Sequence, residues 1–470
     1  WSFTTEPVGY PIDGANIAAT ASSVGDATFG PENTINGSGL DANDLHSTVA
    51  PDMWLSSNEP QGAWIRYEFD KPYKLHEMWV WNANQTLEGL FGFGMKNVSV
   101  EYSANGADWT ALVMLSPFTK APGTAGYAHD TTVDFGGAAA KYVRLAASAN
   151  WGGILPQYGL SEVRFFYIPV MAREPWPDRG ATGVGVDGTL SWRAGREAAA
   201  HSVYLSTDQQ AVIDGTVPTV SVTGASYSSA LDLASNYYWR IDEVNEAQTP
   251  STWQGDVWDF TTEESIVVDD FEDYNDYPPN EIYTTWLDGY ADSANGSQVG
   301  NLTPPLAETK IVHGGKQSMP LFYANTGGAT YSEGKRTFTA PRNWTQHGIK
   351  TLTIWFRGTA GNTGQLYVKI NNSKITYTGE AANLARTGWQ PWNIDLTAAG
   401  VSLQSVNSLA VGIDGNGAIG TLYFDDIRLY PYPRQLITPV TPGTASLVGH
   451  WTFDGNTQDS STKANHGTSG

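Results

Sequence analysis

The stretch Trp258-Asp259-Phe260-Thr261-Thr262-Glu263 decides the fold, because it closes a run of short predicted strands and repeats an earlier stretch, Trp1-Ser2-Phe3-Thr4-Thr5-Glu6. The strands before the second copy are predicted where apolar and polar residues alternate, at 189–192, 202–206, 237–243 and 255–261. By self-similarity, we expect residues 1–6 to be the last strand of an equivalent module whose body lies upstream. The repeat therefore predicts a row of separate β-modules.

Composition supports this all-β fold. The 470 residues include 50 glycines, 18 tryptophans, 23 tyrosines and 16 phenylalanines, and only 16% of them are charged. Such a composition is typical of short strands joined by turns. The length suits about three domains, and no apolar stretch is long enough to predict a membrane-spanning helix. We therefore predict tandem β-sandwich modules without membrane insertion.

The charge of the chain excludes several partners. There are 48 acidic and 26 basic residues, so the formal net charge is −22. Nucleic acid and anionic lipid are bound through basic residues, and an acidic chain repels both. An acidic surface instead suits neutral or cationic ligands and Ca²⁺. The sequence contains no cysteine, which excludes disulfides and zinc sites built on thiolates.

No catalytic motif stands out in the sequence. The eight histidines are scattered, and neither His-Glu-x-x-His nor Gly-x-Ser-x-Gly occurs. Residues 183–188 match Gly-x-Gly-x-x-Gly, but that motif binds pyrophosphate only where a helix follows, and here a strand is predicted at 189–192. Carboxylates are plentiful, yet no pair is singled out as a glycosidase acid and nucleophile. We predict a non-catalytic chain, and any catalytic domain would lie outside it.

Proline-rich joints mark the predicted module boundaries. Prolines cluster at 169–177 and at 431–442, where extended linkers are expected. The chain divides accordingly into a last strand at 1–6, a large sandwich at 7–168, a smaller module at 169–263, a second large sandwich at 264–432, a proline-rich linker at 433–446 and the start of a further domain at 447–470.

Four sequence blocks run through the first sandwich. They are Asn-Thr-Ile-Asn-Gly at 33–37 with Met-Trp at 53–54, Ala-Trp-Ile-Arg-Tyr-Glu-Phe at 63–69, Val-Ser-Val-Glu-Tyr-Ser at 98–103 with Asp-Trp at 108–109, and Lys-Tyr-Val-Arg-Leu at 141–145 with Gly-Leu-Ser-Glu-Val-Arg-Phe at 159–165. In this order they resemble a discoidin, or coagulation-factor type C, domain, the fold of many galactose-type binding modules. The resemblance implies that loops at one end of the sandwich bind carbohydrate, and the candidates are Asn82, Asn84, Phe91 and Trp151.

The same resemblance implies a structural calcium ion. Many members of the family hold Ca²⁺ with an Asp-Gly pair and a late glutamate. In this chain the pair is Asn36-Gly37, which weakens the site, and Asp41 or Asp44 in the following loop can compensate. Glu162 fits the late position.

Three further stretches resemble known modules. Tyr-Tyr-Trp-Arg-Ile-Asp-Glu at 237–243, with the closing Trp-x-Phe-Thr-Thr strand, resembles a fibronectin type III domain, which implies a spacer. Val-Asp-Asp-Phe-Glu at 268–272 and Leu-Tyr-Phe-Asp-Asp-Ile-Arg-Leu at 422–429 resemble the first and last strands of calcium-containing jelly-roll carbohydrate-binding modules. Residues 447–456 resemble the start of a laminin-G or concanavalin-like domain. The predicted fold class is therefore all-β, with tandem jelly-roll and fibronectin/immunoglobulin-like sandwiches.

Acidic residues on the first and last strands of the third module predict a second calcium site. In a jelly roll these strands come close, so the carboxylates would repel one another unless a cation joined them. The alternative is that they are solvated acids at a sheet edge. The predicted ligands are Asp269, Asp270, Glu272, Asp425 and Asp426.

Strand parity predicts sugar contacts in the same module. Leu352, Ile354 and Phe356 form one core face, which turns Trp355 and Arg357 outward. Likewise Tyr367 and Lys369 alternate with core residues, and Tyr323 and Tyr377 lie in neighbouring strand-like stretches. Sugars stack their C–H faces on exposed rings and bind polar groups through their hydroxyls. The alternative is that these rings pack against neighbouring protein, as we expect for Trp389 and Trp392.

Together these patterns predict an extracellular carbohydrate-binding or adhesion array, part of a larger secreted or cell-surface bacterial protein. Its partners would be polysaccharides or glycoconjugate glycans, and Ca²⁺ would be structural. Two alternatives remain open. One is a surface-layer, filament or matrix protein whose modules bind other copies of the same protein, and the other is the accessory region of a polysaccharide-degrading enzyme.

Overall fold

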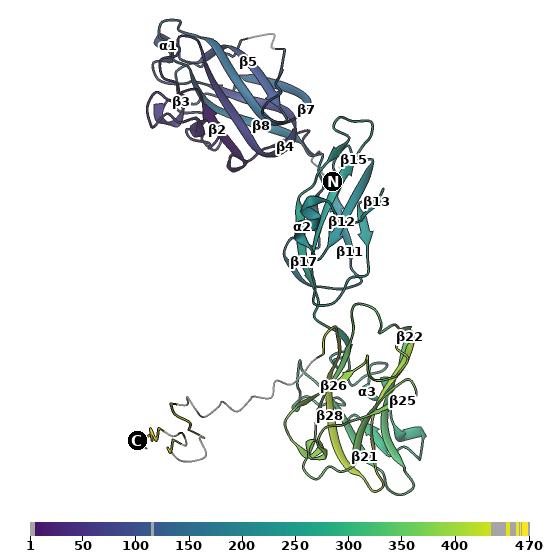
Figure 1. Ribbon diagram of the computed structural model, residues 1–470. Coiled ribbons are helices and arrows are strands. Elements are labelled where there is room, and N and C mark those ends of the chain that lie inside the picture. Colours follow the sequence, from purple (N-terminus) through teal and green to yellow (C-terminus); the bar gives the residue numbers. More distant parts are fainter. Residues whose placement is uncertain are drawn as a thin grey trace. The chain divides into compact units, whose positions relative to one another are not determined.

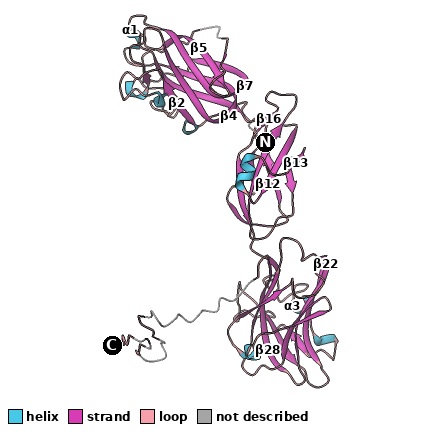
Figure 2. Ribbon diagram, viewed as in Figure 1, coloured by secondary structure: helices cyan, strands magenta, loops and turns pink. Residues whose placement is uncertain are grey.

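Strands make up nearly all the regular structure, which confirms the all-β prediction (Figure 2). The structure, a computed structural model, describes residues 5–113, 117–433, 448–451, 457–459, 461 and 463–468. No helix among these residues is long and apolar enough to cross a membrane. The described residues fall into two compact units, 1–229 with 236–262 and 230–235 with 263–470. Most of the strand expected at 1–6 and of the linker expected at 433–446 lies outside the described residues, as does part of the domain start expected at 447–470.

A single eight-stranded antiparallel sheet forms the first module (Figure 1). Its order is β1-β8-β4-β7-β5-β6, with β2 paired to β4 and β3 paired to β8. The two longest strands, β4 (Ala63–Asn82) and β7 (Thr131–Asn150), shift register partway along their pairing, and such shifts let a sheet bend around its core. The remaining elements are β1 (Tyr10–Pro11), η1 (Gly14–Asn16), β2 (Ile17–Ala21), η2 (Pro31–Thr34), η3 (Ala50–Asp52), β3 (Trp54–Leu55), α1 (Glu88–Phe91), β5 (Met95–Ser103), β6 (Thr110–Ala111) and β8 (Gly159–Ile168).

Alternation along β4 explains how this sheet finds its core. Ile65, Tyr67 and Phe69 are buried, whereas Trp64, which lies between two buried residues, is 38% exposed. The rings of Tyr67 and Phe69 lie edge-on to Phe165 of β8, with centroids 5.2 and 5.1 Å apart. Burial of each such ring stabilises the fold by about 2 kcal/mol. The sheet therefore has one apolar face and one face open to the surroundings.

Two smaller sheets form the second module. Their orders are β10-β17-β15-β12-β13, with β16 paired to β15, and β14-β11-β9. Trp239 of β15 is fully buried and lies edge-on to Trp192 of β11 and to Trp258 of β17. The repeated Trp-x-Phe motif thus places Trp258 and Phe260 in the core. The elements are β9 (Arg173–Trp176), β10 (Ala181–Val184), β11 (Thr189–Arg193), β12 (Ala200–Ser206), α2 (Gln209–Asp214), β13 (Thr219–Val222), β14 (Ser226–Ser228), β15 (Asn236–Val244), β16 (Thr252–Trp253) and β17 (Val257–Thr262).

The third module, in the second unit, is built from two sheets. Their orders are β20-β21-β28-β23-β26, with β18 paired to β28, and β19-β22-β27-β24-β25. The core face predicted for 352–356 and 366–370 is buried as expected. The strands are β18 (Ile266–Asp269), β19 (Trp286–Leu287), β20 (Ser297–Val299), β21 (Met319–Ala324), β22 (Tyr331–Arg342), β23 (Thr351–Arg357), β24 (Gln365–Ile370), β25 (Ser373–Thr376), β26 (Gln390–Asp395), β27 (Val406–Asp414) and β28 (Ile419–Tyr430). The short helices are α3 (Ile282–Thr285), η4 (Gly289–Ala291) and η5 (Ala381–Ala385).

Candidate functional site

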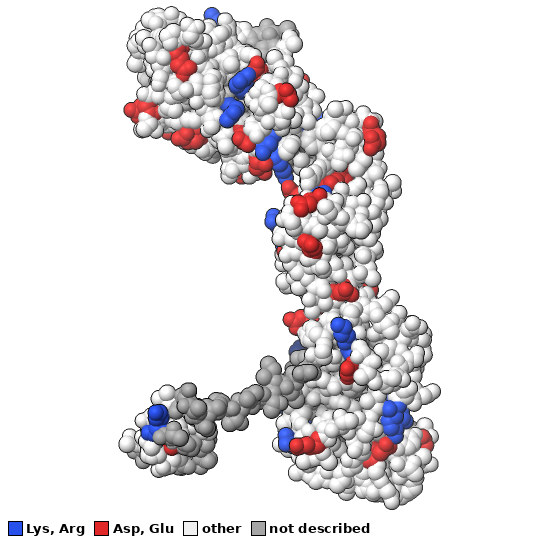
Figure 3. Space-filling view, in the orientation of Figure 1, with Lys and Arg blue, Asp and Glu red and all other residues white. Residues whose placement is uncertain are grey.

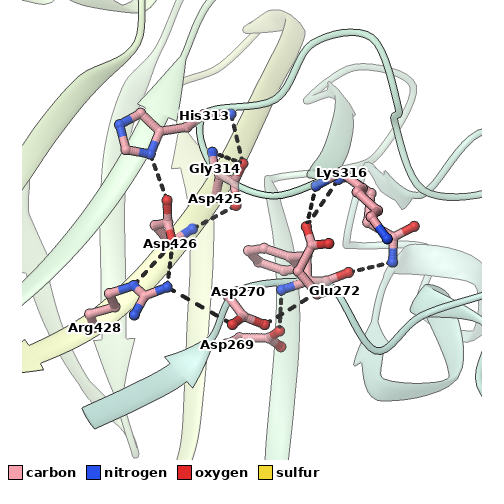
Figure 4. A network of polar contacts seen from close by, with 11 residues as sticks. Asp269, Asp270, Glu272, His313, Gly314, Lys316, Asp425, Asp426 and Arg428 are labelled. Carbon is pink, nitrogen blue, oxygen red and sulfur yellow. Dashed lines mark hydrogen bonds and ion pairs between the residues drawn. The ribbon is translucent and has the colours of Figure 1, made fainter. Parts of the chain in front are cut away.

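The acidic residues predicted to bind calcium in the third module do lie on neighbouring strands (Figure 4). β18 pairs antiparallel with β28, and Asp269 is opposite Ile427. Asp425 is fully buried and accepts backbone N–H bonds from His313 at 2.8 Å, from Gly314 at 3.2 Å and from Asp426 at 2.8 Å. Burial raises the pKa of Asp425 to about 6, against the pull of these donors.

Asp426 is held by two side chains. His313 Nδ1 lies 2.6 Å from Asp426 Oδ2, and Arg428 donates to Oδ1 from Nε at 3.0 Å and from Nη2 at 2.8 Å. The hydrogen bond from His313, and after it those from Arg428, keep the pKa of Asp426 below its usual range. Asp426 is therefore an ionised carboxylate whose charge is already balanced within the protein.

The other acidic residues of this group also have protein donors. Glu272 Oε1 accepts the N–H groups of Lys316 at 2.8 Å and Gln317 at 3.0 Å, and Asp270 lies 3.9 Å from Arg428. The donors to Asp269 are Phe271 N, Tyr274 Oη, Trp286 Nε1 and Arg336 Nη1.

These contacts bear on whether the five residues fit a calcium ion. Ca²⁺ takes six to eight oxygen ligands, which must have free lone pairs directed at one point. Here backbone N–H groups, Arg336 and Arg428 occupy the carboxylates and supply the positive charge. Among the described residues, no group of three or more acidic, histidine or cysteine side chains is arranged to hold a metal. These donors use part of the acceptor capacity of the third-module acids, and the calcium ion predicted there stays a prediction.

Glu162 in the first module is different. Its side chain is buried, Oε1 accepts only a long hydrogen bond from Gly37 N at 3.3 Å, and Oε2 is buried without a hydrogen-bond partner. Burial raises the pKa of Glu162 to about 8. A carboxylate in this state takes up either a proton or a cation. Glu162 thus fits the predicted calcium site.

The two residues predicted to join Glu162 are used in local turns. Asn36 Oδ1 accepts the N–H of Ser38 at 2.7 Å, and Asp41 Oδ1 accepts those of Asn43 and Leu45. Asp44, the other candidate for compensation, forms a two-pronged ion pair with Arg164 at 2.7 Å.

Two of the rings predicted to contact sugar in the third module are buried. Tyr367 is 0% exposed, because its ring lies over Gly412 of the next strand and its hydroxyl donates to Glu333 at 3.0 Å. Lys374 Nζ lies 4.2 Å from the centroid of the same ring and covers it. Tyr323 is 3% exposed and donates to the carbonyl of Thr363. The prediction that these two rings are free is wrong.

Trp355 and Arg357 do face away from the core, as parity predicts, but both are half-buried. The imidazole of His313 stacks on Trp355 with centroids 3.8 Å apart, and Trp389 lies edge-on to His313 at 5.8 Å. Arg357 donates to the carbonyl of Thr387. Trp389, expected in the core, is therefore part of this outer cluster.

The last two candidates of the third module, Lys369 and Tyr377, also have protein partners. Lys369 pairs with Glu333 at 2.5 Å. The ring of Tyr377 packs between Phe356 and Trp392, each at 5.3 Å. Trp392 is 6% exposed, which confirms its place in the core. Lys369 is therefore paired with an acid, and the ring of Tyr377 is packed between two other rings.

In the first module, the two predicted asparagines are structural. Asn82 is fully buried and donates to the carbonyls of Met95 and Thr119, both at 2.8 Å. Asn84 is fully buried as well and donates to the carbonyls of Ser47 and Thr124. Their amides satisfy carbonyls of the loops around them, so the prediction that they contact sugar is wrong.

Phe91, the last residue of α1, and Trp151, in the loop after β7, are both half-buried. Gly152 N donates to the carbonyl of Gly92 at 2.8 Å, and a Cβ on Gly152 would lie 1.5 Å from the carbonyl oxygen of Phe91. Gly152, which follows Trp151, therefore allows its backbone to pack closely against that of Phe91 and Gly92. Trp151 Nε1 donates to the carbonyl of Phe118, and Lys96 Nζ lies 4.6 Å from the ring centroid.

An open groove of about 800 Å³, absent from the predicted sites, lies on the outer face of the first module's sheet. Trp64 of β4 is opposite Ala146 of β7, which is opposite Ser99 of β5. The small side chains of Ala146 and Ser99 leave a hollow beside the larger ring of Trp64. None of the residues that line the groove is charged, and its polar groups come from Gln61, Asn97, Ser99 and Ser148. The alternation of apolar residues in 63–69 could have indicated that Trp64 faces away from the core.

Comparisons with known proteins bear on the first module alone. The family model of the F5/8 type C domain matches residues 18–156. No curated protein matches the chain. The solved structures that match include CBM32-3 from a family 31 glycoside hydrolase of Clostridium perfringens, at 17% identity over 33% of this chain and 94% of that one, with a TM-score of 0.26.

Two further solved structures are similar over the same share of the chain. The family 32 carbohydrate-binding module of NanJ from Clostridium perfringens, in complex with galactose, has 15% identity over 34% of this chain and 99% of that one, with a TM-score of 0.26. Chitosan-binding module 1 of a chitosanase/glucanase from Paenibacillus sp. IK-5 has 18% identity over 32% and 94%, with a TM-score of 0.22. On the family match and the sheet described above, residues 18–156 form an F5/8 type C domain.

Proposed function

We propose that the chain is a non-catalytic carbohydrate-binding protein whose first module binds a neutral glycan in the groove beside Trp64. The groove itself is the observation that carries the proposal, since it joins an exposed indole to an uncharged polar floor. The F5/8 type C match supports it, because that fold is shared with many galactose-type binding modules. The other candidate rings of the chain are buried or half-buried under protein.

The chemistry of the groove favours a neutral sugar chain. A pyranose presents a C–H face that stacks on an indole, and its hydroxyls exchange hydrogen bonds with amide and hydroxyl groups. Asn97, Ser99 and Ser148 supply such groups without charge. The net charge of −22 opposes a polyanionic glycan. On the face seen in Figure 3, charged side chains are scattered and leave wide uncharged areas.

Affinity electrophoresis of the full chain through gels that contain neutral polysaccharides tests this proposal. We expect at least one neutral polysaccharide to retard the chain. Trp64→Ala should bind that polysaccharide about tenfold more weakly, because the stacked ring is lost. Trp176→Ala is the matched control, since Trp176 is a 54% exposed tryptophan of the second module. Equal migration of Trp64→Ala and the parent chain would contradict the proposal.

Calcium belongs to the same proposal as a structural ion at Glu162. Its orphaned, buried oxygen supports a cation there, whereas none of the five acids predicted as ligands in the third module has such an oxygen. Bound Ca²⁺ would offset the charge of Glu162 and fix the loop that begins at Gly37. The wider setting that we propose is extracellular, in an adhesion array or in the accessory region of a polysaccharide-degrading enzyme.

A further inference from the structure

A groove of about 650 Å³ in the third module is lined by several large exposed apolar side chains. Tyr290 is 100% exposed, Leu302 is 86% exposed and Leu287 is 57% exposed, and all three line the groove. Tyr283, at 42%, adds a second ring. Exposed apolar groups gathered in one hollow mark a binding surface in a folded module.

The groove lies where the two sheets end. β19 is the edge strand of one sheet and β20 is the edge strand of the other. Asp288 joins them, because its Oδ1 accepts the N–H of Tyr290 and its Oδ2 accepts the N–H of Val299 in β20, each at 2.9 Å. This carboxylate holds the turn that bears Tyr290 against β20.

Two further contacts fix the same turn. A Cβ on Gly289 would lie 2.0 Å from the carbonyl oxygen of Asn295, so only glycine allows the turn to pack this closely. Asp292 accepts the N–H of Ala294 at 3.0 Å and the hydroxyl of Tyr331 at 2.9 Å. The exposed ring of Tyr290 therefore stands on a turn held by several contacts, and little conformational entropy would be lost there when a ligand binds.

A second hollow, of about 540 Å³, continues from the first. Both are lined by Gln298, Asn301 and Leu302, and the second adds Phe322, which is opposite Gln298 in the sheet. Gln298 Nε2 donates to the carbonyl of Gly300, and Asn301 Nδ2 donates to that of Pro305. The side-chain carbonyl oxygens of both amides are left to accept hydrogen bonds from a ligand. Two joined hollows suit a chain of several units.

We infer that this double groove is a second glycan-binding site, selective for a neutral oligosaccharide of several sugars. Tyr283, Tyr290 and Leu302 would pack on C–H faces, while Asp288, Asp292 and Gln298 would accept hydrogen bonds from hydroxyl groups. The first hollow is lined by Asp288 and Asp292 and by no basic residue, and the second by Glu308 and Lys310, so the double groove has an excess of negative charge that disfavours uronic-acid or sulfated chains. The inference deepens the proposed function and rests on it for the class of ligand.

Calorimetric titration of the full chain with a neutral oligosaccharide series of increasing length tests the inference, with the polysaccharide family chosen by the gel panel. We expect Tyr290→Ala, made in the Trp64→Ala chain, to abolish the binding that remains there, and affinity at this site to rise with oligosaccharide length. Tyr277→Ala is the matched control, since Tyr277 is 75% exposed but does not line the groove. Polygalacturonate is the charged probe and should give no heat.

The two proposals fail separately. If Trp64→Ala weakens binding and the further change Tyr290→Ala does not, the second site is overturned and the first stands. If Tyr290→Ala weakens binding and Trp64→Ala does not, the first site is overturned and the second stands. The alternative occupant of an apolar groove is a second copy of this chain. Analytical sedimentation of the parent chain and of Tyr290→Ala tests whether the groove mediates such self-association. A loss of self-association in this variant, without a loss of sugar binding, would overturn the second site.

Discussion

At Glu162, a single carboxylate oxygen without a partner sets the response of the first module to pH and to calcium. The pKa of this buried acid is raised to about 8 from a usual value of 4.5, so the folded state holds the proton more tightly than the unfolded state. The stabilising effect of that proton is complete below about pH 4.5 and is lost as the pH rises through about 8. Without a cation, the first module should therefore weaken over this range.

Glu162→Gln tests this account. Glutamine keeps the shape and removes the charge, so at pH 8 in chelator the variant should be more stable than the parent chain, by a few kcal/mol. At pH 5 the two should be alike, and added Ca²⁺ should stabilise only the parent chain. Scanning calorimetry at both pH values measures this. A variant that is less stable than the parent at pH 8 in chelator would contradict the account.

In the third module, Arg428 supplies positive charge beside Asp426, one of the acids predicted to bind calcium. Its guanidinium pairs with Asp426, and backbone N–H groups bind Asp425. In the Glu162→Gln chain, chelator should thus leave every calorimetric transition unchanged. Arg428→Gln should lower the stability of the third module by about 1 kcal/mol, since the pair is partly exposed. A transition that shifts on chelation in the Glu162→Gln chain would reveal an ion elsewhere.

At the scale of the elements, the contact between β24 and β27 depends on a glycine. A Cβ at Gly412 would lie 2.6 Å from the ring of Tyr367 and 2.5 Å from the carbonyl oxygen of Ser332. Gly412→Ala should cost about 1–3 kcal/mol, because the ring must move in a packed layer. Tyr367→Phe removes only the hydroxyl bond to Glu333 and should cost about 1 kcal/mol. Urea unfolding measures both, and glycan binding should not change in either variant.

Strand parity shows how far sequence reasoning reaches at this scale. Alternation in β23 and β24 correctly placed Leu352 and Leu366 in the core and turned Trp355 and Tyr367 to the opposite face. It could not show that Lys374 of the adjoining strand β25 covers Tyr367, or that His313 of a distant loop stacks on Trp355, because alternation says nothing of contacts between side chains of different segments. The same rule turns Trp64 of β4 outward, although Trp64 was not among the predicted contacts. The groove beside it depends on Ala146 and Ser99, which only the sheet register places next to Trp64.

The roles of asparagines and acids were harder to predict, because their hydrogen-bond and charge partners lie elsewhere in the chain. A polar residue in a loop predicts exposure, but Asn82 and Asn84 satisfy buried carbonyls. The acids on the first and last strands of the third module were correctly expected to be close together. Their charge partners, Arg336 and Arg428, carried no distinguishing signal in the sequence.

For the whole molecule, the acidic balance predicts how binding should respond to salt. A neutral glycan held by stacking and neutral hydrogen bonds should bind with nearly the same affinity at about 0.1 M and 1 M salt, although charge screening differs strongly between the two. A polyanion should remain unbound at both, because the net charge of −22 repels it. Gel retardation at the two salt concentrations checks this. A steep fall in neutral-glycan affinity with salt would contradict an uncharged site.

The organisation of the molecule was predictable because it follows from local patterns. The strand around Trp258 and Phe260 and the paired first and last strands of the third module correspond to observed elements, whereas most of the proline-rich joint at 431–442 lies outside the described residues. The family match at 18–156 agrees with the module assigned to 7–168. The fibronectin III-like and laminin-G-like assignments stay predictions.

Calorimetric titration of a neutral oligosaccharide into the full chain and into Trp64→Ala, at equal concentration and pH, tests the central claim most directly. We predict a measurable heat of binding for the parent chain and an affinity about tenfold weaker for the variant, with circular dichroism unchanged. Equal affinity of the two chains for every neutral oligosaccharide tried, or binding only to anionic ones, would contradict the claim.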